Sequence, residues 1–309
     1  MSNVKVKLNK LEVQNFLQRK ISATTSDVEF LSGGEVSQAY GYSRENKQFV
    51  IRFNPDDFGF KKDLFSYKNF SSPRIPIPKV HRIGKYSKNL WFSISARVSG
   101  NSLDSYCIKT QKNLLPKTLR ILNAIHESDV TITEGYGEWD TEGKGDFLNW
   151  KLYIKSFIEG KEDNEWINWP KIIATTFFEK DLYDFISERV NKLVRHCPEE
   201  RYLLHGDYSF DNIGSDGSKI TGIFDWADSM YGDFLFDVAR LDLFMEDVDI
   251  KSIYLKLFPE KKKQVKFNER WDCYMLIVYL DALGFYAKTN QKEKYDLAKG
   301  ELLNRFDED

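Results

Sequence analysis

Residues 202–228 read YLLHGDYSFDNIGSDGSKITGIFDWAD, and the order of apolar and polar residues in this stretch decides the fold. The runs YLL and ITGIF have the composition of short β-strands. Asp207 and Asn212 follow the first run, and Asp225 stands at the end of the second. We predict a hairpin that carries Asp207 in a loop and delivers Asp225 from an apolar run that folding would otherwise bury.

The three polar residues have the chemistry that phosphoryl transfer needs. A carboxylate at a buried strand end is costly to desolvate unless an ion meets it. Asn and Asp oxygens suit Mg²⁺, so we predict that Asn212 and Asp225 are metal ligands. Asp207 is the candidate catalytic residue, which orients an acceptor hydroxyl and takes its proton. Ordinary turns are also rich in Asp and Asn, but the spacing of Asp207, Asn212 and Asp225 favours a catalytic and metal-binding site over an ordinary turn. We interpret His205 as a buried residue that holds the loop.

The sequence before this segment is typical of an antiparallel sheet with one helix. Residues 28–53 contain three runs rich in β-branched and aromatic residues, separated by Gly and polar breaks. Residues 61–70, KKDLFSYKNF, have helical spacing of apolar positions, and VHRIGKYS and LWFSISARV, within residues 80–98, predict a strand pair.

A change of pattern near Gly100 indicates two lobes. The run LLPKTLRILNAIHESD has helical periodicity, with Pro116 expected in the first turn of the helix. We therefore predict an α+β protein with a β-rich N-terminal lobe at residues 1–98 and a hinge at about 95–100. Residues 101–309 are predicted to form a mainly helical lobe that includes the loop of Asp207. The Trp-rich residues 136–169 are either core or the wall of a ligand pocket.

The charge and hydropathy of the chain limit the kinds of partner that it is expected to bind. The formal net charge of −2 argues against nucleic acid as a partner. No continuous apolar stretch is long enough to span a membrane, so we expect a cytoplasmic protein without a membrane partner. From Asp207 to Asp249, eleven acidic residues face two basic ones. That run is either a solvated acidic face or a pocket for a cation, a metal or an amine.

The segments HGDYSFDN and IFDWADSMYGDFLFDVARL resemble the catalytic and metal-binding segments of the aminoglycoside phosphotransferase family, relatives of protein kinases. The chain also has, upstream of these two segments, LSGGEVSQAYGY, IPIPKVHRIGKYS and SISARVSGNSL in the order found in the hygromycin-like subgroup of that family. The resemblance therefore covers about residues 31–244. It implies a two-lobed protein-kinase-like fold, in which residues 1–98 are the nucleotide-binding lobe and residues 101–309 hold the catalytic loop and the acceptor pocket. It also implies ATP or alternatively GTP, Mg²⁺, and phosphorylation of a hydroxyl of an aminoglycoside antibiotic, a reaction that confers resistance.

The resemblance also assigns residues on the nucleotide side. Asp207 matches the catalytic carboxylate, and Asn212 and Asp225 match the metal ligands. Asp237 matches a structural Asp at a helix start, where a carboxylate caps free N–H groups. The cofactor-binding candidates are Gly33, Gly34 and Ser37 in the phosphate-covering turn, Arg52 and Asp63 in place of the usual Lys–Glu pair, and Ser95 and Arg97 beside the adenine. Arg52 departs from the family pattern, and a surface arginine on an edge strand is the alternative.

The acceptor side follows from the charge of aminoglycosides, which are polycations. Acidic residues near the catalytic loop are the candidates, together with the aromatic residue that follows the helix start. They are Asp211, Asp228, Asp242, Phe244 and Glu246. Several of these acids are alternatively ordinary surface charges.

Two other functions fit parts of the sequence. A housekeeping kinase of the same fold, acting on an amino alcohol, a sugar or a nucleoside-like metabolite, would share every nucleotide-side residue. A nucleotide-binding regulator without turnover would explain Arg52, but the presence of Asp207, Asn212 and Asp225 argues against it. We expect a monomer that acts on a small cationic substrate.

Overall fold

The computed structural model of the chain describes residues 7–21, 26–33, 37–162, 164, 166–243, 245 and 248–306. The chain divides into two compact units. The first comprises Met1–Ile125, Asp140–Gly143 and Phe210–Ser229, and the second comprises His126–Trp139, Lys144–Ser209 and Met230–Asp309. The predicted lobe boundary near residues 95–100 stays a prediction.

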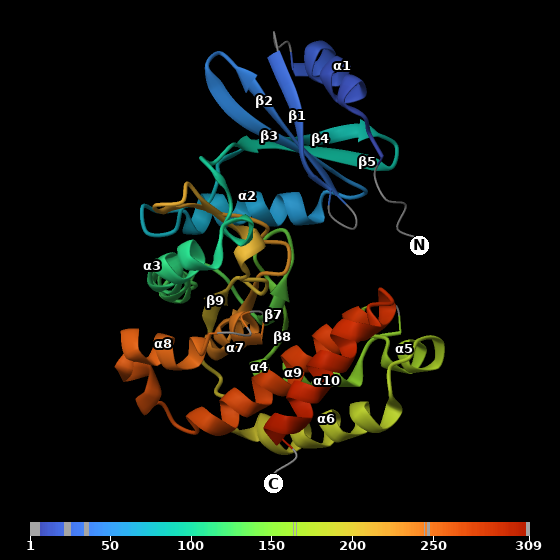
Figure 1. Ribbon diagram of the computed structural model, residues 1–309, viewed down its shortest axis with the longest axis vertical. Helices are drawn as coiled ribbons and strands as arrows, with labels where there is room; N and C mark the ends of the chain where they lie inside the picture. The colour runs from blue at the N-terminus through green and yellow to red at the C-terminus, as the bar shows by residue number, and fades with distance from the viewer. Residues whose placement is uncertain are drawn as a thin grey trace. The chain divides into compact units, whose positions relative to one another are not determined.

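The first unit contains a five-stranded antiparallel sheet with the strand order β1-β2-β3-β5-β4. The strands are β1 (Ser26–Gly33), β2 (Gln38–Arg44), β3 (Lys47–Asn54), β4 (Val80–Ser87) and β5 (Leu90–Ala96). Helix α1 (Lys10–Ile21) lies beside this sheet (Figure 1) and adds Val13 and Leu17 to a core with Ile51 and Phe53. Since Ile51 and Phe53 are buried and Arg52 between them is not, one face of the sheet is buried. The predicted strands in residues 28–53 and 80–98 are confirmed.

Two further helices belong wholly or mainly to this unit. They are α2 (Phe58–Phe70), as predicted from its spacing, and α3 (Ile108–His126). The expected position of Pro116 is wrong, because it lies inside α3 and not in its first turn. The helix begins earlier because the Cys107 carbonyl accepts hydrogen bonds from the N–H groups of Thr110 and Gln111, at 2.9 and 3.2 Å. Proline in a helix interior removes one backbone hydrogen bond.

A second, three-stranded sheet in the first unit has the order β11-β10-β6. Its strands are β6 (Asn101–Ser102), β10 (Ile213–Ser215) and β11 (Ile220–Ile223). The predicted hairpin of the runs YLL and ITGIF is wrong, because β11 pairs with the nearer β10, while YLL pairs with residues 230–232 in a sheet of the second unit. Gly100 makes the close approach possible, because a Cβ atom at this residue would lie 1.8 Å from the carbonyl oxygen of Ser215, and its φ is +85°. Only glycine adopts this backbone conformation at little cost.

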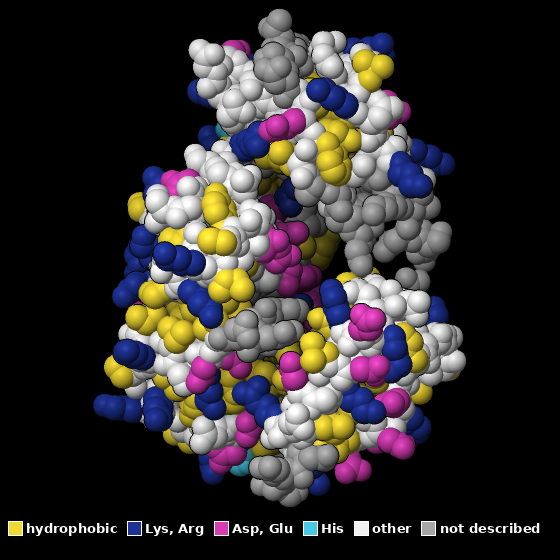
Figure 2. Space-filling model, viewed as in Figure 1, with side chains coloured by type: hydrophobic (Ala, Val, Ile, Leu, Met, Phe, Trp, Pro, Cys, Tyr) yellow, Lys and Arg dark blue, Asp and Glu magenta, His cyan; other side chains and the backbone are white. Residues whose placement is uncertain are grey.

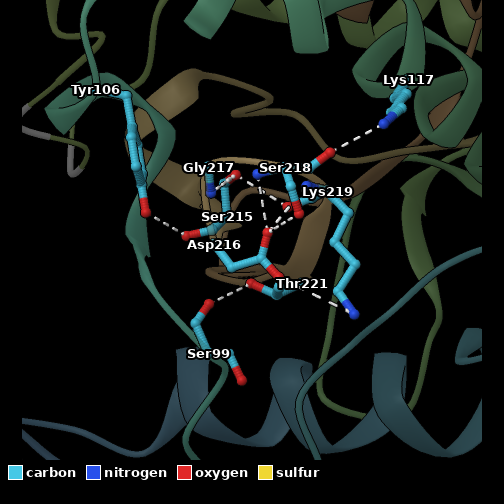
Figure 3. A network of polar contacts seen from close by, with 9 residues as sticks. All are labelled: Ser99, Tyr106, Lys117, Ser215, Asp216, Gly217, Ser218, Lys219 and Thr221. Carbon is cyan, nitrogen blue, oxygen red and sulfur yellow. Dashed lines mark hydrogen bonds and ion pairs between the residues drawn. The ribbon is translucent and has the colours of Figure 1, made fainter.

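The β10–β11 turn is tied to its surroundings by a polar network (Figure 3). Tyr106 donates a hydrogen bond to the Ser215 carbonyl at 2.8 Å, and Lys117 donates to the Ser218 carbonyl at 2.9 Å. The Asp216 carboxylate accepts the backbone and hydroxyl hydrogens of Ser218, at 2.9 and 2.7 Å. These bonds lower the pKa of Asp216 to about 2. The hairpin that carries Asn212 is therefore anchored at its tip.

The second unit is mainly helical around a four-stranded sheet of order β8-β7-β12-β9. The strands are β7 (Tyr136–Trp139), β8 (Gly145–Phe147), β9 (Tyr202–Leu204) and β12 (Met230–Gly232). The helices are α4 (Trp150–Glu159), α5 (Trp169–Thr175), α6 (Lys180–Leu193), α7 (Leu235–Leu243), α8 (Ile250–Leu257), α9 (Phe267–Lys288) and α10 (Lys292–Phe306). Helix α9 is buried along most of its length and packs against α6, α7 and α10 (Figure 1).

The Trp-rich segment belongs mainly to the core of this second unit. Trp139, Trp150 and Trp169 are fully buried, and the Trp150 indole donates a hydrogen bond to Tyr274 at 2.9 Å. Trp166 is 41% exposed and stacks on Phe285. Of the two interpretations of this segment, core packing therefore holds for three of its four tryptophans. Within the described part of the chain, no helix has the length and apolar character to cross a membrane.

Candidate active site

Helix α2 holds the turn that follows Asp225. Lys62 and Asp63 lie on the side of α2 that meets this turn. The Lys62 ammonium donates a hydrogen bond to the Ser229 carbonyl at 3.0 Å, and the Asp63 Oδ1 atom accepts one from the Trp226 N–H at 3.0 Å. Trp226 and Ser229 are themselves joined by a 3.1 Å backbone hydrogen bond that closes the turn. Sequence reasoning missed Lys62, which is fully buried.

Asp63 also pairs with Arg52 of strand β3. The Arg52 guanidinium forms a charge-assisted hydrogen bond with Oδ2 of Asp63, so the structure brings these two predicted residues together. Burial alone would lower the pKa of Arg52, but the Asp63 and Asp225 carboxylates outweigh that effect and raise it. Arg52 is therefore a fixed cation that lies within the electrostatic reach of Asp225. Contact between Arg52 and phosphate stays a prediction.

Asp225 has an unusual backbone and an exposed side chain. Its φ is +65°, in the left-handed region, where a residue with a Cβ atom pays roughly 1–2 kcal/mol. The expectation of a buried carboxylate at this position is wrong, because Asp225 is exposed while Ile223 and Trp226 are fully buried. Strand β11 ends at Ile223, so Asp225 lies beyond the strand and its side chain leaves the apolar run. Strain of this kind is often found at functional sites.

Asn212 is linked to the same segment through the backbone. Its carbonyl accepts a hydrogen bond from the Phe224 N–H at 3.1 Å, directly before Asp225, and its side chain is 8% exposed. One amide oxygen and one carboxylate oxygen therefore come from adjoining stretches of one unit. Mg²⁺ in nucleotide sites is typically held by one or two protein oxygens together with phosphates, and this donor set fits it. Asn212 and Asp225 stay predicted ligands.

The loop that carries Asp207 is held by Asp237 of helix α7. The two oxygens of Asp237 accept hydrogen bonds from the backbone N–H groups of His205 and Gly206, each at 2.9 Å. The N–H groups that Asp237 binds thus belong to the loop before Asp207, and not to its own helix as the capping assignment implied. His126 Nε2 lies 3.1 Å from the same carboxylate. Burial would raise the pKa of Asp237, but the hydrogen bond from His126 and the loop N–H groups lower it.

The side chain of Asp207 contacts a cation that sequence reasoning missed. Its Oδ1 atom forms an ion pair with Arg240 Nε at 3.4 Å, and Arg240 Nη1 donates a hydrogen bond to Asp281 Oδ2 at 2.9 Å. The carboxylates of Asp207 and Asp281 are about one-third exposed, at 32 and 33%. The Asp207 N–H donates to His205 Nδ1 at 3.3 Å, and His205 is fully buried, as predicted for a residue that holds the loop.

The acceptor candidates fall in both units. Asp211 and Asp228 are exposed residues of the first unit, and Asp242 is a mostly buried residue of the second. Burial raises the pKa of Asp242, which accepts the Lys251 N–H at 3.2 Å. Phe244 and Glu246 lie outside the described residues. The acceptor contacts of all five stay predictions.

Asp242 lines a cavity of about 1120 Å³ in the second unit. Side chains of both charges line it, so the surroundings of Asp242 are not acidic alone. The charged lining residues are Asp242, Asp249, Glu269, Glu301, Lys251, Lys262, Lys266 and Arg305. Over most of the face shown in Figure 2, basic and acidic side chains are likewise interspersed. Arg305 lies 3.7 Å from Asp242, so this acid already has a basic neighbour.

The acidic run from Asp207 to Asp249 is divided among separate structural roles. Asp233 is fully buried and pairs with the Arg270 guanidinium at 2.6 Å and with the Tyr274 hydroxyl at 2.7 Å. Asp237 holds the Asp207 loop, and Asp249 accepts the Ser252 N–H at 2.8 Å as the N-cap of α8. Neither a single solvated face nor a single cation pocket accounts for the whole run.

The remaining nucleotide-side candidates lie in or near the five-stranded sheet. Gly33 ends β1, Gly34 lies outside the described residues, and Ser37 comes directly before β2. Ser95 lies in β5, and the Arg97 N–H donates to the Gln48 carbonyl at 3.1 Å. Nucleotide binding by these residues stays a prediction.

Comparisons with known proteins identify the family of this chain. The profile of the phosphotransferase enzyme family matches residues 27–251. Hygromycin-B 4-O-kinase of Escherichia coli is 28% identical over 282 residues, which are 90% of this chain and 80% of that protein.

Solved structures agree with the sequence comparison. A thermostable mutant of aminoglycoside phosphotransferase APH(4)-Ia, in a ternary complex with AMP-PNP and hygromycin B, matches with a TM-score of 0.80 and 27% identity, over 94% of this chain and 96% of that one. Spectinomycin phosphotransferase APH(9)-Ia, with ADP and spectinomycin, matches with a TM-score of 0.59 and 13% identity, over 96% of this chain and 95% of that one, and shows the fold alone. The predicted protein-kinase-like fold is confirmed.

Proposed function

Because the chain belongs to the phosphotransferase enzyme family, we propose that it transfers the γ-phosphoryl group of ATP to a hydroxyl of a hygromycin B-like aminoglycoside. The observation that carries this proposal is the fixed loop of Asp207, whose preceding N–H groups are both bound by Asp237. A carboxylate on such a loop is prepared to receive a proton in a defined direction. Phosphorylation of the antibiotic would confer resistance.

The reaction uses Asp207 as the group that meets the acceptor. Its carboxylate hydrogen-bonds the acceptor hydroxyl and takes its proton as the hydroxyl oxygen bonds to the γ-phosphorus. The bond from the γ-phosphorus to the bridging oxygen breaks, that oxygen keeps the electron pair, and ADP leaves. Phosphoryl transfer leaves the protein little covalent chemistry to do, so positioning and electrostatic stabilisation of the transferred group supply most of the acceleration.

The nucleotide side is assigned to the first unit. Asn212 and Asp225 would hold Mg²⁺, which neutralises phosphate charge when bound. Arg52, held by Asp63, supplies a second positive charge for the phosphates. Guanidinium binds phosphate through two N–H groups, whereas lysine acts as a point charge, so an Arg–Asp pair preserves the charge pattern with a different geometry.

The acceptor is a small cationic molecule, for which acidic side chains of this chain are the complementary groups. Dependence on ATP is consistent with a cytoplasmic enzyme, and we propose a monomer without a nucleic-acid or membrane partner. Competition between ATP and GTP in the same assay shows which of the two nucleotides is the phosphoryl donor.

A panel of acceptors tests the proposal. The purified chain is incubated with Mg–ATP and one acceptor at a time, chosen from hygromycin B, other aminoglycosides, amino alcohols, sugars and nucleosides. The products are identified by mass spectrometry. We expect a singly phosphorylated aminoglycoside, with hygromycin B among the best acceptors. Exclusive phosphorylation of a metabolite such as an amino alcohol would instead establish the housekeeping alternative.

A further inference from the structure

Helix α7 contacts the Asp207 loop at two points. Asp237 and Arg240 are three residues apart, which places them on one face of the helix. Asp237 binds the backbone of His205 and Gly206, while Arg240 contacts the side chain of Asp207. Consecutive loop residues are thus held by one helix face, the first two by their backbone and the third by its carboxylate.

Arg240 is itself held from a second helix. Its Nη1 atom donates to Asp281 of α9 at 2.9 Å, and its side chain is only 18% exposed. The Nε–Oδ1 distance of 3.4 Å to Asp207 is longer than a typical N–H···O hydrogen bond. The closer partner is therefore Asp281, and the guanidinium is fixed by α9 before it acts on Asp207. All three side chains lie in the second unit.

We propose that Arg240 and Asp281 form a positioning pair for the catalytic carboxylate, an inference that rests on the proposed role of Asp207. Asp281 fixes the guanidinium, and the guanidinium restrains the rotation of the Asp207 carboxylate. Neither residue transfers a proton or contacts the phosphates. A misplaced carboxylate lowers the rate of transfer even when substrates bind normally, because the reacting atoms no longer meet in line.

The charge of Arg240 is suited to this role. A lysine would place one ammonium group near two carboxylates, whereas the planar guanidinium offers separate N–H groups to Asp207 and Asp281 at once. The Arg240 cation also offsets the repulsion between the carboxylates of Asp207 and Asp281, which lie 3.4 and 2.9 Å from it. The geometry therefore explains why an arginine stands at this point of α7.

The test compares Arg240→Met, Arg240→Lys and Asp281→Asn with wild type by steady-state kinetics below the melting temperature of every variant. We expect Arg240→Met to lower kcat on the order of tenfold to a hundredfold, since the Asp207 carboxylate loses the ion pair that restrains its direction. KM for ATP should stay unchanged. Arg240→Lys should recover part of kcat, and Asp281→Asn should cause a smaller loss than Arg240→Met. The control is Lys299→Met, which breaks an ion pair with Glu179 in the same unit and should leave kcat unchanged.

The decisive comparison is made in an Asp207→Ala background, where Arg240→Met should cause no further loss because it acts through the missing carboxylate. Additive losses, a change confined to KM for ATP, or a lowered melting temperature with normal kcat would each overturn the proposal. If wild type phosphorylates none of the acceptor panel, the proposed acceptor class fails separately. The same variants are then compared by their rates of ATP hydrolysis, in which water replaces the acceptor hydroxyl. The outcomes named above then support or overturn the role of Arg240 in the same way. If Arg240→Met does not fold, Arg240→Lys and Asp281→Asn carry the comparison.

Discussion

Asp63 on helix α2 accepts a hydrogen bond from the backbone N–H of Trp226 at 3.0 Å. Its second carboxylate oxygen pairs with Arg52, so a single side chain joins strand β3 to the segment that carries Asp225. One carboxylate therefore has two separable functions, one in holding a loop and one in holding a cation. Substitutions that remove only one of them distinguish the two.

Asp63→Asn should keep the loop and release the cation. The amide oxygen can still accept the Trp226 N–H, but the ion pair with Arg52 is lost. We expect kcat/KM for ATP to fall on the order of tenfold to a hundredfold, since the interaction is worth about 1.5–3 kcal/mol. The losses from Asp63→Asn and Arg52→Met should be non-additive, and Arg52→Lys should recover part of the rate. Zero coupling in this double-mutant cycle would remove the pair from nucleotide binding.

Asp225 combines a strained backbone with a predicted metal ligand, so stability and function should separate there. Asp225→Gly relieves the left-handed conformation at φ +65° and should unfold no more easily than wild type. The same variant lacks the carboxylate and should bind Mg–ATP weakly. Calorimetric titration with Mg–ATP, together with the melting temperature, checks both statements. A glycine variant with wild-type Mg–ATP affinity would show that Asp225 is not a ligand.

Asp237→Asn should destabilise the fold by about 3 kcal/mol, because an amide cannot accept both loop N–H groups and His126. The hydrogen bonds from His126 and the loop hold the folded-state pKa of Asp237 below the ordinary value of an aspartate, so the contribution of the carboxylate to stability is present in full above that ordinary value. The difference between wild type and variant should therefore shrink as the pH falls through the lowered pKa. Urea unfolding at neutral and acidic pH measures it, with Asp296→Asn, which alters an exposed pair, as the control. A constant difference across that range would contradict the assignment.

Gly100 and Gly300 should respond oppositely to alanine. At Gly100 the new Cβ atom would meet the Ser215 carbonyl at 1.8 Å in a left-handed backbone, a conformation that alone costs about 1–3 kcal/mol. Gly300 lies within α10 with nothing within 4 Å of the added atom. Alanine there should stabilise the helix by about 0.5–1 kcal/mol. Thermal melting of both variants tests the contrast, which equal shifts of the same sign would refute.

Local sequence patterns were sufficient to predict those elements and site residues that are recognised by their spacing along the chain. The strands of residues 28–53, the α2 helix and the order of Asp207, Asn212 and Asp225 are visible without a structure, because alternation and fixed offsets are local properties. The exposure of Asp225 was not visible, since it depends on β11 ending at Ile223. The interior position of Pro116 was missed because the start of α3 is set by the Cys107 carbonyl.

Contacts between distant segments account for the rest. Lys62 and Ser229 are separated by 167 residues, and nothing near Lys62 in the sequence indicates that its ammonium is buried. Two signals for Arg240 and Asp281 were available. Arg240 follows Asp237 at helical spacing, and Asp281 is an acid within the apolar run MLIVYLDALGF. A lone charge in a buried helix needs a partner, although its identity requires the packing of α7 on α9.

The most direct test of the central claim is Asp207→Ala, measured for both phosphoryl transfer to hygromycin B and binding of Mg–ATP. Mass spectrometry follows the phosphorylated product, and calorimetry follows the nucleotide. The account predicts that wild type forms the product and that the variant forms almost none while its affinity for Mg–ATP is nearly unchanged. Normal transfer by the variant, or a loss that is confined to nucleotide affinity, would contradict it.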